Sequence, residues 1–134
     1  MLEAWLLRRV RGLRTDLAIT QALRAFDRIP EVPRIDAVAR ALDLSPRRFG
    51  ARFAAEVGLS PKRYCRVRRF QTLLQRVHGT AAPDWAGLAA DCGFADQPHL
   101  VREFRAYAGI SPTAWLRRQT TYANHVPVDF STDA

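Results

Sequence analysis

The sequence has little cysteine and no long apolar run, and each of these shortages excludes a class of protein. Its two cysteines, Cys65 and Cys92, are too few for a disulfide scaffold or a four-thiolate zinc site. No apolar stretch approaches the length needed to cross a bilayer. Between Met1 and Arg14 an apolar patch precedes the arginines, which reverses the order of a secretory signal. We therefore expect a cytoplasmic protein with no membrane partner and with reduced thiols, Cys92 being a small core residue.

Side chains suited to catalysis or metal binding are few and scattered. The two cysteines and the three histidines, His78, His99 and His125, have neither metal-ligand spacing nor the pattern of a catalytic triad. The sequence also lacks a glycine-rich loop for phosphate. We expect neither an enzyme nor a bound cofactor or metal. A metal site built from both cysteines and a histidine is the alternative.

Arginine supplies almost all of the positive charge, and it is concentrated in one segment. The chain has a formal net charge of +8, and Lys62 is its single lysine. Residues 47–76 hold nine basic side chains against one acid, Glu56, so this segment accounts for the whole excess. A solvated helix face is the ordinary explanation for one charged stretch. A basic block of this length instead favours a polyanionic partner.

Two stretches of the sequence, residues 35–64 and 85–115, repeat one another. Matching positions differ by 50 up to Leu44, and by 51 from Phe49 onward. The second copy therefore has one extra residue, in the turn between its two helical stretches. A unit of two helices and a turn, present twice in a basic chain, predicts two DNA-reading modules in tandem.

Serine–proline pairs mark three helix starts. A serine oxygen caps the first free N–H groups of a helix, and proline at the first helical position sacrifices no hydrogen bond. Either Thr15 or Asp16 is expected to cap the helix that begins at Leu17, and Asp84 and Asp96 are expected to cap two further helices. Asp36 suits the dipole at the start of a short helix. The three pairs are Ser45-Pro46, Ser60-Pro61 and Ser111-Pro112.

Apolar spacing then predicts an all-α fold, because strand signals are absent throughout. The longest helix, from Pro61 to about His78, is expected to turn Tyr64, Val67, Phe70, Leu74 and Val77 toward the core. The expected helices cover residues 17–26, 35–42, 46–58, 61–78, 85–91, 97–109 and 112–119.

The sequence divides into four parts by these signals. Residues 1–15 are an amino-terminal linker helix, and residues 16–78 form the first helix-turn-helix unit together with the long helix. The stretch 79–83 (GTAAP) is the clearest linker and opens the second unit, residues 79–119. Residues 120–134 have no convincing period and are expected to be a tail.

The repeated unit also resembles a known family. The strings LDLSPRRFGARFAAEVGLSPKRY and CGFADQPHLVREFRAYAGISPTAW are similar to the DNA-binding domain of AraC/XylS-type bacterial transcription regulators, over roughly residues 16–119. The most specific part is the second string. The resemblance implies seven helices, with two helix-turn-helix units joined by a long linker helix. It also implies that both recognition helices read successive major grooves of double-stranded DNA.

Candidate base-reading residues follow from the resemblance and from exposure at helix starts. Arg102 matches the arginine of the family's second recognition helix, and its planar fork suits a guanine edge. Gln97, at the start of that helix, suits adenine, although simple solvation of a helix end explains it equally well. In the first unit Arg47 and Arg48 occupy the exposed start, and Arg47 is the better candidate. A surface ion pair with Glu103 or a neighbouring residue is the alternative for Arg102.

The first unit departs from the family pattern. The arginine that usually stands two residues before the core phenylalanine is replaced by Ala51, and Arg52 is shifted by one position. One position turns a side chain by about 100° on a helix, off the side that faces the groove. Gly50 removes another reading side chain. This unit is expected to read few bases, with Ala51 against a thymine methyl group as a further expectation.

Other side chains are expected to contact the DNA backbone, which positions the protein without reading sequence. Some of them are expected only to be solvated or paired with acids, and His99 is as readily explained as a packed histidine. The candidate backbone contacts are Ser45, Lys62, Arg63, Arg66, Arg69, His99 and Arg105.

The sequence thus predicts a transcription regulator, an activator by family analogy, that binds DNA as a monomer across two grooves. Most family members carry a separate sensor domain, which this sequence lacks, and dimerisation through such a domain is a further expectation. Contact with RNA polymerase is also expected. The alternative is a helix-turn-helix interaction module that docks on RNA polymerase or another regulator without specific DNA binding. A membrane-surface role is disfavoured, because the apolar side of the basic helix is needed for the core.

Overall fold

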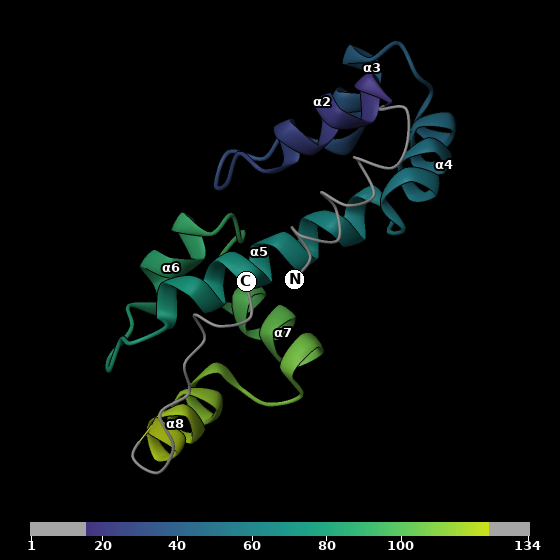
Figure 1. Cartoon of the computed structure of the whole chain (residues 1–134). Helices are drawn as coiled ribbons and strands as arrows, with labels where there is room; N and C mark the ends of the chain where they lie inside the picture. The colour runs from purple at the N-terminus through teal and green to yellow at the C-terminus, as the bar shows by residue number, and fades with distance from the viewer. Residues whose placement is uncertain (1–15, 124–134) are drawn as a thin grey trace. The chain divides into compact units, whose positions relative to one another are not determined.

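A computed structural model describes residues 16–123, with side chains up to Gln119, as helices joined by short turns (Figure 1). No strand occurs within these residues, so the predicted all-α fold is confirmed. The predicted linker helix at residues 1–15 and most of the predicted tail lie outside the described residues. Residues 16–123 form seven helices: α2 (Leu17–Phe26), α3 (Ile35–Ala41), α4 (Pro46–Val57), α5 (Pro61–Val77), α6 (Trp85–Asp91), α7 (Gln97–Ala108) and α8 (Pro112–Ala123).

Local capping explains where these helices begin. In each of the three serine–proline pairs, the serine Oγ accepts a hydrogen bond from the backbone N–H three residues later, at 3.2 Å. Asp96 caps α7 through the backbone N–H of His99 at 2.8 Å, and Asp16 caps α2 through that of Ala18 at 3.1 Å. Gly58 and Gly109 end α4 and α7 with positive φ angles of 89° and 79°. The start signals read from the sequence are therefore confirmed.

Gly87, which is unfavourable inside a helix, is explained by the cap of α6. Asp84 accepts a hydrogen bond from the Gly87 backbone N–H at 3.2 Å. A Cβ at position 87 would lie 2.5 Å from Asp84 Oδ2, closer than two such atoms can approach. The missing side chain therefore leaves room for the capping carboxylate.

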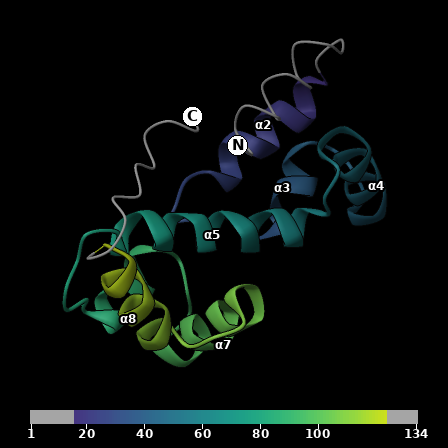
Figure 2. The ribbon, with the colours of Figure 1, turned by 60° about the horizontal axis from the view of Figure 1, so that its bottom comes forward.

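The chain forms two compact units, the first ending at Arg68 and the second beginning at Arg69. The division falls within α5, which is one continuous helix (Figure 2). The first part of α5 thus contributes to the core of the first unit and the remainder to that of the second. The linker at residues 79–83 lies within the second unit.

Aromatic rings fill the core of the first unit. Phe26 from α2, Phe49 and Phe53 from α4, and Tyr64 from α5 are each at most 1% exposed. Their ring centroids are 5.6–6.4 Å apart, in tilted or edge-to-face pairs. The Tyr64 hydroxyl donates a hydrogen bond to Asp27 Oδ1 at 2.8 Å. Burial and this hydrogen bond raise the pKa of the Tyr64 phenol above its ordinary value.

The second core is built around Leu73, Val77, Leu100 and Phe104, all fully buried. Phe104 packs edge-to-face against Trp115 of α8, at 5.8 Å between centroids. Cys92 is also fully buried there, and burial raises the pKa of its thiol, as suits a small core residue.

The predicted apolar face of α5 is largely confirmed. Tyr64 and Val77 are buried, and Phe70 and Leu74 are partly buried and pack against the second core. Val67 is partly exposed, and Cys65 and Leu73 are buried in addition. The cause is that α5 supplies two cores, so its buried positions do not follow one stripe. The last helix also differs, since α8 runs to Ala123 rather than ending near Gln119.

No helix among residues 16–123 is long and apolar enough to cross a membrane.

Candidate nucleic-acid interface

The turn between α3 and α4 has a defined backbone geometry. Asp43 takes a left-handed conformation with a φ of 56°, and its N–H donates to the carbonyl of Arg40 at 3.0 Å. The next N–H, of Leu44, donates to the carbonyl of Ala39 at 2.9 Å. These bonds close α3 and redirect the chain toward the Ser45 cap of α4.

The turn between α6 and α7 repeats that geometry at the matching positions. Gly93 has a φ of 85° and donates to the carbonyl of Ala90 at 3.3 Å, and Phe94 donates to that of Ala89 at 2.9 Å. Each partner lies 50 residues after its counterpart in the first turn. Both halves of the sequence repeat are therefore helix-turn-helix units, in which α4 and α7 are the second helices.

Apart from Arg52, the exposed side chains of α4 are long only in its first turn. Arg47 and Arg48 are exposed, and neither forms an ion pair with any residue between 16 and 119. Beyond them Ala51 is exposed, and a Cβ added to Gly50 would meet nothing within 4 Å. The remainder of this side of α4 consists of small residues. Arg47, Arg48 and Ala51 thus lie on the exposed side of α4.

Arg52, the arginine shifted by one position, is bound within the first unit. Its Nη2 and Nε lie 2.6 Å and 3.1 Å from Asp16 Oδ2, at the start of α2. The Asp16 side chain is 17% exposed and that of Arg52 45%. Arg52 thus has an acid partner within its own unit.

The exposed side of α7 carries longer side chains than that of α4. Gln97 is exposed at the first helical position, and Arg102 and Arg105 are exposed further along. Arg102 forms no ion pair with Glu103 or with any other residue between 16 and 119, and Glu103 Oε1 lies 3.4 Å from His99 Nε2. At an offset of 51, Arg102 and Arg105 take the places of Ala51 and Ala54 in the first unit.

The candidate backbone contacts lie in several environments. Ser45, Lys62 and Arg63 are exposed at the starts of α4 and α5, whereas Arg66 and Arg69 are partly buried. The Arg69 guanidinium lies 5.9 Å from the centroid of the Phe94 ring, in the turn before α7. Both ring nitrogens of His99 have partners within the second unit, as expected for a packed histidine, the alternative to a phosphate contact.

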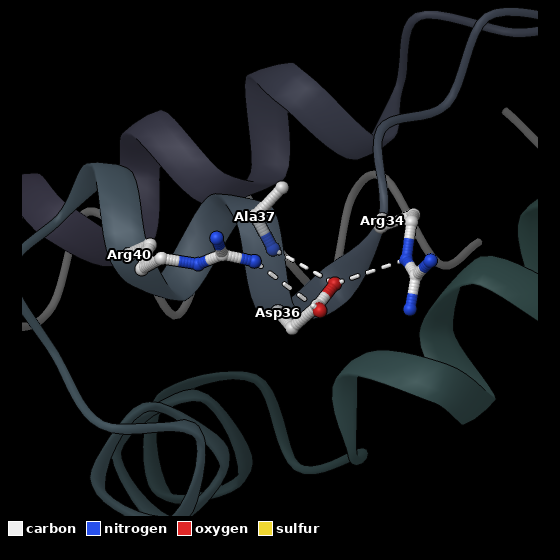
Figure 3. Close-up of polar contacts among 4 residues, drawn as sticks. All are labelled: Arg34, Asp36, Ala37 and Arg40. Atoms are coloured by element: carbon white, nitrogen blue, oxygen red, sulfur yellow. Dashed lines mark hydrogen bonds and ion pairs between the residues drawn. The ribbon is translucent and has the colours of Figure 1, made fainter.

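Two basic side chains outside the candidate set flank an acid on α3. Asp36 Oδ1 lies 3.2 Å from Arg34 Nε, and Asp36 Oδ2 lies 3.4 Å from Arg40 Nη2 (Figure 3). Loss of hydration alone would raise the pKa of Asp36, but the two guanidinium groups and the Ala37 N–H outweigh it and lower that pKa. Sequence reasoning assigned Asp36 only to the helix dipole, although the i, i+4 spacing to Arg40 indicated a pair.

Two helix-turn-helix units, each with an exposed and polar start to its second helix, define a DNA-binding domain. A family model described as a helix-turn-helix domain matches residues 38–118, more than half of the chain. The chain belongs to this AraC-type helix-turn-helix family. Because the family consists of transcription regulators, the expectation that the chain is not an enzyme is confirmed.

Similar proteins agree with the assignment. The HTH-type transcriptional regulator Rv1931c of Mycobacterium tuberculosis (strain ATCC 25618 / H37Rv) is 35% identical over 89 residues, which is 63% of this chain. The aligned part is 32% of that relative, so the chain spans about a third of its length.

Solved structures show the same fold. The DNA-binding domain of AdpA, a global transcriptional factor solved in complex with a target DNA, has a TM-score of 0.69 at 23% identity, covering 81% of this chain and 98% of that one. An AraC-type regulator from Chromobacterium violaceum has a TM-score of 0.63 at 24% identity, covering 77% and 91%. The fold predicted from the sequence, with two helix-turn-helix units, is thereby confirmed.

Proposed function

We propose that this chain binds double-stranded DNA sequence-specifically and thereby regulates transcription. The observation that carries the proposal is the repeated turn. In both units the same backbone bonds place an exposed helix start after the turn, as major-groove reading requires. The neighbouring AdpA domain, solved with a target DNA, supports this partner.

The second unit carries most of the sequence specificity in this proposal. Arg102 is exposed and unpaired within the described residues, so its planar fork is available to the O6 and N7 atoms of guanine. Gln97 stands at the exposed start of the same helix, where its amide suits adenine.

The first unit supplies affinity and register more than specificity. Arg47 and Arg48 reach base edges from the start of α4, and Ala51 lies against a thymine methyl group. Backbone contacts come from a wider set, which positions the protein on the duplex. That set is Ser45, Lys62, Arg63, Arg66, Arg69 and Arg105.

In the proposed complex one chain contacts two successive grooves. The 17 residues of α5 span about 25 Å at 1.5 Å per residue. Successive turns of the major groove lie ~34 Å apart. Binding as a monomer is therefore proposed, together with activation through contact with RNA polymerase.

The test is a measurement of affinity for a selected target and for a scrambled duplex across a range of salt concentrations. Arg102→Ala should lose ~1–3 kcal/mol of discrimination at one base pair. Arg63→Ala, the matched control, should weaken both duplexes alike and reduce the salt slope by about one. Equal loss of discrimination in both variants would contradict this division of roles.

A second function is favoured by the small side chains on α4. Gly50, Ala51 and Ala54 leave most of its exposed side without groups that read bases. Such a surface suits a module that docks on RNA polymerase or another regulator. The same titration decides between the two functions, because no preference for the target at any salt concentration would support the docking module.

A further inference from the structure

The extra residue of the second unit is Ala95, between the turn and the cap of α7. In the first unit the residue that closes the turn, Leu44, is followed directly by the cap Ser45. In the second unit Ala95 separates the corresponding Phe94 from the cap Asp96. The insertion adds one backbone N–H that has no counterpart in the first unit. Ala95 is exposed, and its N–H nevertheless has an acceptor within the second unit.

His99 supplies that acceptor. Its Nδ1 accepts a hydrogen bond from the Ala95 N–H at 3.0 Å. A neutral imidazole whose Nδ1 accepts carries its proton on Nε2, and this nitrogen faces Glu103 Oε1 at 3.4 Å. The ring also packs edge-to-face against Phe94, with 5.4 Å between the centroids. Three contacts of one side chain thus join the inserted residue, the turn and the second turn of α7.

We propose that His99 is a positioning residue, which fixes the inserted turn and so sets how α7 presents Gln97 and Arg102 to DNA. This inference rests on the proposed function. In this proposal His99 does not contact a DNA phosphate, because both of its ring nitrogens already have partners inside the unit. The first unit needs no such residue, and Arg48 stands at the matching position with an exposed side chain.

Three variants of His99 separate its contacts. His99→Asn places an amide oxygen near the Nδ1 position and keeps the acceptor for Ala95. His99→Gln reaches instead toward the Nε2 position and Glu103, and His99→Ala removes both contacts. Arg105→Ala on the same helix is the matched control for a phosphate contact. A thermal melt of each variant establishes that it folds.

The first measurement is amide hydrogen exchange at Ala95 in the free protein. His99→Ala and His99→Gln should accelerate exchange of this amide by about three- to tenfold, the range expected for one lost hydrogen bond. His99→Asn should retain the wild-type rate. Wild-type exchange in His99→Ala, or faster exchange in the asparagine variant than in the glutamine variant, would overturn the assignment of the acceptor.

The second measurement is discrimination between the target and a duplex scrambled in the half-site of the second unit. His99→Ala should lower the affinity ratio about three- to tenfold while leaving the salt slope unchanged. Arg105→Ala should reduce the slope by about one and retain the ratio. A reduced slope in His99→Ala would show that His99 contacts phosphate and would overturn the proposal.

Failure of the proposed function has a different signature. If the wild-type protein shows no preference between the two duplexes, specific DNA binding by this chain is excluded. The exchange rate of the Ala95 amide still decides, without DNA, whether His99 fixes the turn.

Discussion

Replacing Asp16 by asparagine should release Arg52 without removing the cap of α2. Asp16 has two roles: Oδ1 accepts the Ala18 N–H at 3.1 Å, and Oδ2 holds the Arg52 guanidinium at 2.6 Å and 3.1 Å. Asparagine caps a helix about as well as aspartate does, but it has no charge. The substitution therefore separates the ion pair from the cap, and Asp16→Ala removes both.

The expected magnitudes follow from exposure. Pairs between exposed charges contribute ~0.2–1 kcal/mol, and hydrogen bonds to charged groups ~1.5–3 kcal/mol. Arg52 is 45% exposed, which weakens its interaction by solvent screening, whereas Asp16 is only 17% exposed. We expect Asp16→Asn to lower the free energy of unfolding by about 1 kcal/mol. Asp16→Ala should lower it by about 2 kcal/mol, because loss of the cap adds about 1 kcal/mol.

Amide hydrogen exchange locates the effect within one unit. The amides of Ile19 and Ala22 on α2 should lose protection, whereas that of Phe104 on α7, in the second unit, serves as the internal control. Arg52→Met completes a double-mutant cycle with Asp16→Asn. A released guanidinium should also strengthen binding to any duplex and raise the salt slope by up to about one.

Additive effects of Asp16→Asn and Arg52→Met on stability would refute an interaction between the two side chains. If Asp16→Asn and Arg52→Met together destabilise the protein by the sum of their separate effects, the two side chains do not interact in solution. If the DNA affinity and salt slope of Asp16→Asn equal those of the wild type, release of Arg52 brings no charge to the duplex.

Three further predictions concern small residues. Gly50→Ala should stabilise the protein by about 1 kcal/mol in urea unfolding, because the added Cβ would meet no atom within 4 Å. A destabilised variant would show that position 50 has no room for a side chain. Gly87→Ala should destabilise by about 1 kcal/mol despite alanine's helix propensity, because it displaces the Asp84 cap, and a stabilised variant would show that the carboxylate simply moves aside. Ala51→Arg should tighten or redirect recognition in the first half-site, and an unchanged site preference in binding-site selection would remove Ala51 from the groove.

The helix starts were predictable because their signals are local. Ser45, Ser60 and Ser111 each bond an N–H only three residues away, so sequence alone contains both partners. The end of α8 was missed for the converse reason. No glycine or proline stands between Gln119 and Ala123, and hydrogen bonding along a helix continues where the apolar period is lost.

Contacts between residues far apart in the sequence could not be predicted from the sequence alone. Asp16 lies 36 residues from Arg52, and no periodicity relates the two. The same holds for α5, in which the burial of Cys65 and Leu73 depends on two separate cores. The family pattern showed that Arg52 was displaced, and the structure was needed to identify its partner.

The two units have the same backbone geometry in their turns, but they differ in which charged side chains are paired inside the unit. In the first unit, Asp16 binds Arg52, and α4 then presents Arg47 and Arg48 followed by small residues. In the second unit, the position of Arg52 is taken by Glu103, whose partner His99 lies on the same helix, and Arg102 stays exposed.

We therefore expect Arg52 and Arg102 to contribute differently to DNA binding, because an acid within the same unit binds the guanidinium group of Arg52 and no acid in the described part of the chain binds that of Arg102. Arg52 is adjacent in sequence to Ala51, the proposed reading position of α4, but is bound by Asp16. Arg102, at the proposed reading position of α7, has no acid partner among the described residues. Charge counted along the sequence places the basic block in residues 47–76. Ion pairs within each unit shift the expected specificity to α7, outside that block.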